Sequence, residues 1–121
     1  MKPSSAKNKG RLFQKLVADL LLSSSKDLTE DDIVSRPMGS PGSDIMLSQA
    51  AVLQWPFDIE CKSNKAGYTP VYNALEQSSA RGRTPLMFFK QNRKEPAVAM
   101  YAADFLKIIK ELNALKEMLK M

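Results

Sequence analysis

Apolar residues recur with helical spacing in three stretches of the chain, and short runs of β-forming residues lie between them. The first stretch begins at Gly10 and carries apolar side chains at the i, i+3, i+4, i+7 and i+8 positions of one helix face: Leu12, Phe13, Leu16, Val17, Leu20 and Leu21. Residues 71–80 and 105–119 predict two further helices, and residues 44–47, 57–62, 85–90 and 97–101 predict strands. This order predicts an α/β fold in which helices flank a small mixed β-sheet.

The length and the composition along the chain predict one folded domain. A chain of 121 residues falls in the usual range of roughly 100–200 residues per domain. Residues 1–9 are basic and lack apolar periodicity, so they predict a mobile basic tail, and residues 10–121 predict a single domain. Pro37, Gly39, Pro41 and Gly42 predict a tight loop before the first long apolar strand.

Two features bear on where the protein works. No segment approaches the roughly 20 apolar residues that cross a bilayer, and Gln14, Lys15 and Asp19 interrupt the first apolar stretch, so we expect neither a membrane partner nor a cleaved signal peptide. The single cysteine, Cys61, has no second cysteine in the chain to pair with. These features predict a cytoplasmic protein, or one of the host-cell cytoplasm if the source is viral.

The net charge and the absence of histidine limit the partners and the catalytic chemistry that the chain can have. The formal net charge of +5 favours a polyanionic partner through counterion release, although a basic protein without such a partner is an equal alternative on charge alone. The absence of histidine excludes Ser–His and Cys–His catalysis and His-ligated zinc. A bound metal is therefore expected to be a hard, oxygen-ligated cation such as magnesium, manganese or calcium, and no organic cofactor is expected.

Three residues form the candidate catalytic set: Asp44, Glu60 and Lys62. Successive side chains alternate across a strand, so Glu60 and Lys62 are predicted on one face, with Ile59 and Cys61 on the other. Asp44 opens an apolar strand directly after the Gly/Pro loop. If the two strands pair as a hairpin-like unit, Asp44 and Glu60 converge on one cation.

Magnesium prefers octahedral oxygen coordination at roughly 2.0–2.1 Å, which Asp44, Glu60, the backbone carbonyl of Cys61 and a phosphate would supply. Lys62 would then lie beside the attacking water, where it can orient that water and offset charge on the phosphate. The alternative is an exposed salt bridge between Glu60 and Lys62, which would contribute little free energy.

An aspartate after a turn, followed by the Glu60-Cys61-Lys62 strand, resembles the active-site motif of the PD-(D/E)XK nucleases. Residues 9–15 resemble the first helix of the Holliday-junction-resolvase branch, residues 36–40 the loop before its metal-binding aspartate, and residues 68–83 the helix after its catalytic lysine. The resemblance implies a restriction-endonuclease-like core, magnesium as cofactor with manganese able to substitute, and branched DNA as substrate.

Further residues are candidates for binding. Gln14 stands where the resemblance expects an acid, and its amide oxygen is predicted as an accessory ligand that adds no charge. Gln77 is predicted to reach the site from the second helix, with an exposed helix glutamine as the alternative. Basic residues predicted to contact DNA, each with ordinary solvation as its alternative, are Lys9, Arg11, Arg36, Lys65, Arg81 and Arg83.

These observations predict a magnesium-dependent endodeoxyribonuclease that acts on branched DNA. The alternatives are a repair or restriction-type nuclease on linear duplex, and a catalytically silent basic DNA-binding module of the same fold. The apolar stripe of the last helix, at Ile108, Leu112, Leu115 and Leu119, suits packing on the sheet or a homodimer seam, and a homodimer is predicted.

Overall fold

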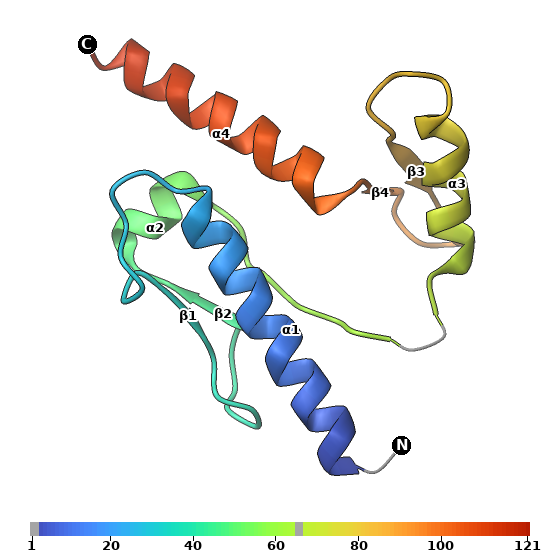
Figure 1. Cartoon of the computed structure of the whole chain (residues 1–121), viewed down its shortest axis with the longest axis horizontal. Coiled ribbons are helices and arrows are strands. Elements are labelled where there is room, and N and C mark those ends of the chain that lie inside the picture. The colour runs from blue at the N-terminus through green and yellow to red at the C-terminus, as the bar shows by residue number, and fades with distance from the viewer. Residues whose placement is uncertain (1–2, 65–66) are drawn as a thin grey trace. The chain divides into compact units, whose positions relative to one another are not determined.

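A computed structural model describes residues 3–64 and 67–121 of the chain (Figure 1). Its elements are, in order, α1 (Pro3–Ser23), β1 (Ile33–Ser35), β2 (Ile45–Leu47), α2 (Gln49–Gln54), α3 (Thr69–Ser79), β3 (Met87–Phe89), β4 (Ala97–Ala99) and α4 (Ala102–Leu119). The mixed α/β class is confirmed. Instead of one mixed sheet, the described residues form two antiparallel two-stranded sheets, β1–β2 and β3–β4. The chain divides into two compact units, which are described separately. The first unit contains residues 1–63 and 109–121, and the second contains residues 64–108.

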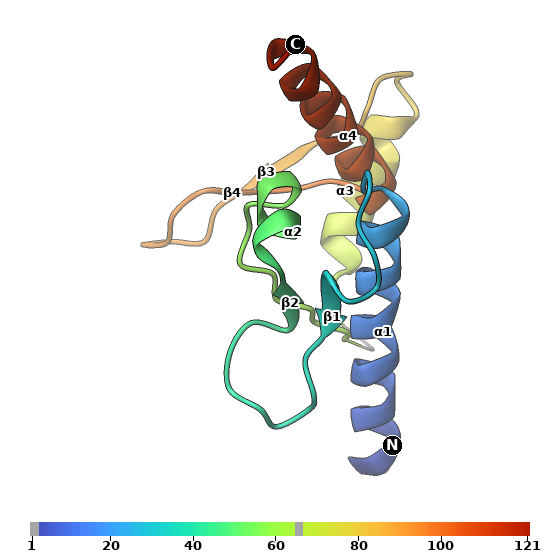
Figure 2. The same ribbon diagram turned by 90° about the vertical axis from the view of Figure 1, so that its left-hand side faces the viewer.

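Helix α1 packs along the β1–β2 hairpin in the first unit (Figures 1 and 2). Its buried residues are Gln14, Ala18 and Leu21, which lie on one helix face at i, i+4 and i+7. The predicted stripe is therefore only partly correct, because its leucines at 12, 16 and 20 are exposed. Gln14 on the buried face donates hydrogen bonds to the hairpin at Ser35, Arg36 and Asp44.

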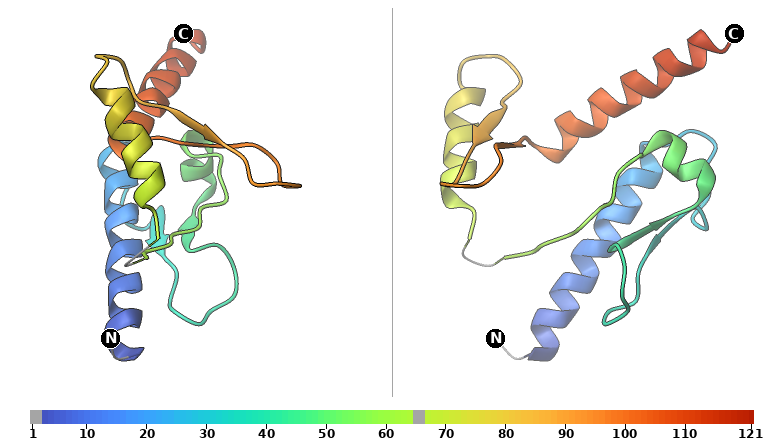
Figure 3. Two further views of the ribbon diagram at one scale, coloured as in Figure 1. Left: turned by 90° about the vertical axis from the view of Figure 1, so that its right-hand side faces the viewer. Right: turned by 180° about the vertical axis from the view of Figure 1, so that it is seen from behind.

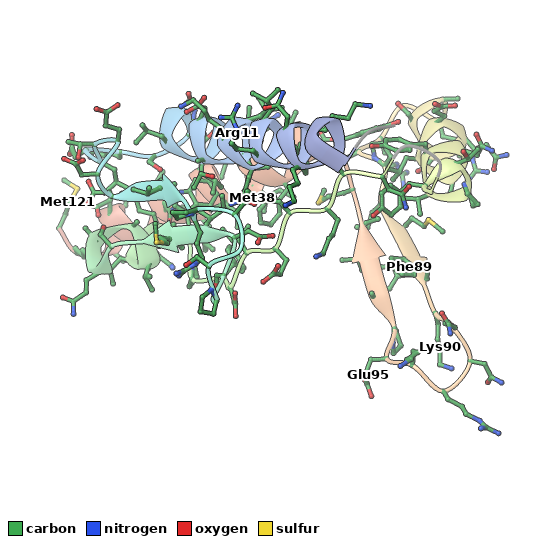
Figure 4. The ribbon with its side chains drawn as sticks, turned by 90° about the horizontal axis from the view of Figure 1, so that it is seen from below. Arg11, Met38, Phe89, Lys90, Glu95 and Met121 are labelled. Carbon is green, nitrogen blue, oxygen red and sulfur yellow. The ribbon has the colours of Figure 1, made fainter. Side chains whose placement is uncertain are left out.

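The N-terminal end of α1 corrects the predicted boundary of the first helix. The helix begins at Pro3, so residues 3–9 are helical, whereas the sequence predicts a helix only from Gly10. Proline suits the first turn of a helix because its fixed φ is helical and its missing N–H would be unpaired there. Gly10 is consequently an interior helix residue, and a Cβ built on it would lie 3.5 Å from Cε of Met38 in the β1–β2 loop (Figure 4).

The short helix α2, which the sequence analysis did not predict, completes the first unit together with the second half of α4 (Figure 3). Trp55 follows α2 and is 0% exposed, and its Nε1 donates a hydrogen bond of 2.7 Å to Oγ of Ser25. Nδ2 of Asn113 on α4 donates a hydrogen bond of 3.1 Å to the carbonyl of Gln54. Ile109 is buried on the same helix. These contacts fix α2 between the end of α1 and residues 109–121.

The second unit contains α3 and the β3–β4 hairpin. Leu75 is buried on α3, and the strands pair in the register Met87↔Ala99, which confirms the predicted helix and the two predicted strands in this region. The turn of the hairpin includes Arg93 at a positive φ of 66°. Figure 4 shows the hairpin from Phe89 to its loop, where Lys90 and Glu95 are labelled.

Helix α4 has Asp104 in its first turn and Lys116 in its last, and both charges interact favourably with the helix dipole. Leu112, Leu115 and Leu119 are 44%, 57% and 87% exposed, so the predicted apolar stripe is present but uncovered. No helix among the described residues is long and apolar enough to span a membrane.

Candidate active site

The main chain of Asp44 is held on both sides. Asp44 lies between the β1–β2 loop and the first residue of β2, and its N–H donates a hydrogen bond of 3.1 Å to the carbonyl of Ile59. Its own carbonyl accepts the N–H of Arg36 at 2.9 Å and Nε2 of Gln14 at 2.9 Å. Every main-chain polar group of Asp44 is therefore paired, which fixes where its side chain begins.

The carboxylate of Asp44 is held as well, because its Oδ2 accepts the N–H of Cys61 at 2.6 Å. The Asp44 N–H bonds the carbonyl of Ile59, and the Cys61 N–H bonds the Asp44 carboxylate, so residues 59 and 61 are tied to the main chain and to the side chain of Asp44.

The structure corrects the predicted strand at residues 57–62. These residues run extended beside Asp44 but form no regular strand. The physical reason is that the Asp44 carbonyl already accepts two hydrogen bonds, so it cannot accept an N–H from this segment as a regular ladder requires. The connection between β2 and this segment contains the six-residue helix α2, and the segment returns past β2 in the opposite direction (Figures 1 and 2).

The contacts of residues 59 and 61 with Asp44 also bring Glu60 close to it. When protonated, the Glu60 carboxyl hydrogen-bonds the Asp44 carboxylate, and this bond, followed by the Asp44 charge, raises the pKa of Glu60 above its usual value. Desolvation and Asp58 raise this pKa further, while the Lys62 ammonium lowers it. Glu60 is exposed, so a solvated cation or a phosphate can reach the carboxylate pair.

Lys62 and Cys61 follow the alternation that the sequence predicts. Lys62 is exposed like Glu60, whereas Cys61 is half-buried. Burial, then the charges of Asp44 and Glu60, raises the pKa of the Cys61 thiol, which therefore stays protonated at neutral pH. Within the described part of the chain no ion pair joins Glu60 to Lys62, so the simple exposed salt bridge is not what the structure shows.

The loop before Asp44 is shaped by Arg36. Its Nε donates a hydrogen bond of 2.6 Å to the carbonyl of Ser43, and its guanidinium lies against Gly42. A Cβ at Gly42 would come within 2.6 Å of Cζ of Arg36, and the φ of Gly42 is +118°, so only glycine fits there. Oγ of Ser43 donates a hydrogen bond to Oδ1 of Asp58. Asp58 was not singled out from the sequence, although its i, i+2 spacing to Glu60 gave the signal.

Gln14 reaches the site from α1. It is 5% exposed, and its Nε2 donates hydrogen bonds of 2.8 Å to the carbonyl of Arg36, 2.9 Å to that of Asp44 and 3.2 Å to Oγ of Ser35. The structure thus brings Gln14 to Asp44 through its amide nitrogen, whereas the sequence analysis assigned the role to its amide oxygen.

The remaining candidates are on other parts of the chain. Lys9 and Arg11 are exposed on α1 in the first unit, and Nη2 of Arg11 donates a hydrogen bond of 2.8 Å to Oδ1 of Asn8 (Figure 4). Gln77, Arg81 and Arg83 are exposed residues of the second unit. Lys65 lies outside the described residues.

The donor set for a metal is small. Among residues 3–64 and 67–121 no three His, Cys, Asp or Glu side chains gather into a metal-binding group, so the donors at this site are the two carboxylates and nearby main-chain carbonyls. Comparisons of the chain with protein-family models, curated proteins and solved structures find no match. Its functional interpretation rests on the geometry of the site.

Proposed function

We propose that the protein is a magnesium-dependent endodeoxyribonuclease with a restriction-endonuclease-like core, whose active site contains Asp44, Glu60 and Lys62. The observation that carries the proposal is the pair of carboxylates, Asp44 and Glu60, which are close enough to raise the pKa of Glu60. Two adjacent carboxylates repel each other when both are ionised, and a divalent cation relieves that repulsion.

The residues present fit magnesium. Magnesium takes oxygen ligands, often one or two carboxylates with water and substrate phosphate, and the Asp44 and Glu60 carboxylates with the Cys61 carbonyl match that set. Bound there, the cation would activate a water and neutralise charge on a phosphodiester. Manganese has the same ligand preference and is expected to substitute.

The residues of the chain have separate roles in this proposal. The Cys61 N–H holds the Asp44 carboxylate in place, so one ligand is oriented before the substrate binds. Glu60 is exposed beside it and shares the approach to the phosphate. Lys62, two residues further along the same face, is placed to orient the attacking water and to stabilise negative charge on the phosphate.

DNA is the proposed substrate because the chain has a net charge of +5 and because the residues resemble the resolvase branch of the PD-(D/E)XK nucleases. Lys9 and Arg11 are exposed in the same unit as the site and can bind backbone phosphates. Branched DNA is the preferred form in this proposal, and linear duplex is the alternative.

The proposal includes a homodimer formed through α4. Leu112, Leu115 and Leu119 have the three–four spacing of a coiled-coil seam and are exposed, while Asn113 on a neighbouring face contacts its own unit. In a parallel pair, Glu111 would lie opposite Lys116 of the second copy, five residues further on, so the flanking charges favour that orientation.

The test is cleavage of supercoiled plasmid and of a four-way junction with and without magnesium. Cleavage that requires magnesium and falls by at least about 100-fold in Asp44→Asn and in Glu60→Gln supports the proposal. Asp31→Asn and Glu30→Gln, which make the same changes at exposed positions away from the site, should retain activity. Cleavage in excess EDTA contradicts the proposed chemistry, and DNA binding without cleavage under any condition identifies the silent binding module.

A further inference from the structure

The amide of Gln14 is an unusual group for its position. The other inward residues of α1, Ala18 and Leu21, are apolar, yet Gln14 is 5% exposed on the same face. Burying an amide costs free energy unless hydrogen bonds replace those it made to water. Gln14 therefore belongs in this interface only because it has polar partners there.

Those partners fix the orientation of the amide. The carbonyls of Arg36 and Asp44, at 2.8 and 2.9 Å, are acceptors only, so the amide must present its nitrogen and use both N–H groups. The two carbonyls belong to the residues that flank the loop at positions 37–43. Gln14 thus closes the base of the loop from which Asp44 emerges.

The hydrogen bond to Asp44 has a second effect. A carbonyl oxygen has two lone pairs, and at Asp44 these accept Nε2 of Gln14 and the N–H of Arg36. The Asp44 main chain is therefore held by Gln14 and Arg36, and the carboxylate that it carries accepts the N–H of Cys61 at 2.6 Å. By holding the carbonyl, Gln14 sets where the Asp44 carboxylate lies.

We propose that Gln14 is the positioning residue of the Asp44 carboxylate and acts through the Asp44 main chain by hydrogen-bond donation. A hydrogen-bond donor is required at this position, because an acceptor would face two carbonyl oxygens. Only the part that concerns cation binding rests on the proposed nuclease function, since the hydrogen bonds can be measured without any cation.

The first measurement uses the wild-type full chain. By NMR, the side-chain amide protons of Gln14 should exchange with water at least about tenfold more slowly than those of Gln91, an exposed glutamine. The Cys61 amide proton should lie downfield, as expected for a short bond to a carboxylate. Fast exchange of the Gln14 amide overturns the proposal without any variant.

The second measurement compares Gln14→Met with Asn113→Leu. Both variants remove an amide that donates to main-chain carbonyls in the same unit, but Asn113 is remote from Asp44 in the hydrogen-bond network. We expect Gln14→Met to abolish the downfield shift of the Cys61 amide proton. It should also raise the manganese concentration that half-saturates the protein about tenfold or more. Asn113→Leu should change neither. Equal effects of the two variants on the Cys61 amide and on the manganese midpoint overturn the proposal, because they would show only a general loss of stability.

A third variant tests the need for a donor. Gln14→Glu keeps the shape of the side chain and replaces the donating nitrogen with oxygen, so at neutral pH its melting temperature should fall below that of Gln14→Met. Wild-type stability in Gln14→Glu contradicts the proposal. If Gln14→Met loses the Cys61 signature and manganese binds neither that variant nor the wild type, the positioning role stands and the nuclease proposal fails.

Discussion

Asparagine at position 44 removes the charge of the site while keeping an oxygen to accept the Cys61 N–H. Hydrogen bonds to charged groups contribute about 1.5–3 kcal/mol and neutral ones about 0.5–1.5 kcal/mol, so Asp44→Asn should cost about 1 kcal/mol at this bond. Loss of the repulsion with Glu60 acts in the opposite direction. Without divalent cations, we therefore expect the free energy of unfolding to fall by no more than about 1 kcal/mol.

Magnesium should stabilise the wild type but not Asp44→Asn. A cation present at ten times its dissociation constant stabilises the folded state by about 1.4 kcal/mol, which raises the melting temperature of a domain of this size by a few degrees. Thermal unfolding followed by circular dichroism should show this rise in the wild type and in Asp31→Asn, and none in Asp44→Asn. An equal rise in Asp44→Asn and in the wild type would refute Asp44 as a ligand.

The free energy of unfolding should depend differently on pH in the wild type and in Asp44→Asn. The pKa of Glu60 is raised in the folded state, so its contribution to stability is present below the unfolded pKa and is lost as the pH rises through the folded pKa. Without cations, the wild type should therefore lose stability relative to Asp44→Asn as the pH rises from about 4 to neutrality. A difference that does not change with pH would contradict the contact between the two carboxyls.

Three further predictions concern activity and assembly. Lys62→Ala should abolish cleavage but keep the magnesium-induced rise in melting temperature, because Lys62 is not a ligand; a retained wild-type rate removes its assignment. Manganese should support cleavage, while calcium, whose coordination is looser, should support DNA binding in gel shifts with little cleavage, and efficient cleavage in calcium would contradict the proposed site. Sedimentation should show a dimer that Leu115→Lys dissociates, and gel shifts should show an affinity for four-way junctions that falls steeply with salt and exceeds that for duplex; a monomer with equal affinities excludes the resolvase proposal.

Helices α1, α3 and α4 and strands β3 and β4 were predictable because their signals are local. Apolar periodicity located the main part of α1, α3 and α4, and the runs of β-forming residues at 85–90 and 97–101 located β3 and β4. The alternation of side chains also predicted that Glu60 and Lys62 share one face and that Cys61 lies on the other, which agrees with exposed Glu60 and Lys62 and a half-buried Cys61. These features depend on neighbours in the sequence, so the sequence is sufficient to find them.

The arrangement around Asp44 was not predictable in the same way. Whether residues 57–62 form a strand depends on which groups occupy the Asp44 carbonyl, and one of them is Gln14, thirty positions away in the sequence. Gln14 itself interrupts an apolar face, and a polar residue there gives no local indication of its partners. The start of α1 at Pro3 was missed because polar residues without apolar periodicity fit a tail as well as an exposed helix end.

The carboxylate of Asp44 fixes the register of the segment that carries Glu60, since it accepts the Cys61 N–H directly. The spacing between the two acids in space is therefore independent of the length of the chain that connects them. Insertions at the exposed position of α2 near Leu53 should leave the carboxylates paired, whereas loss of the Asp44 carboxylate would release the segment that carries Glu60.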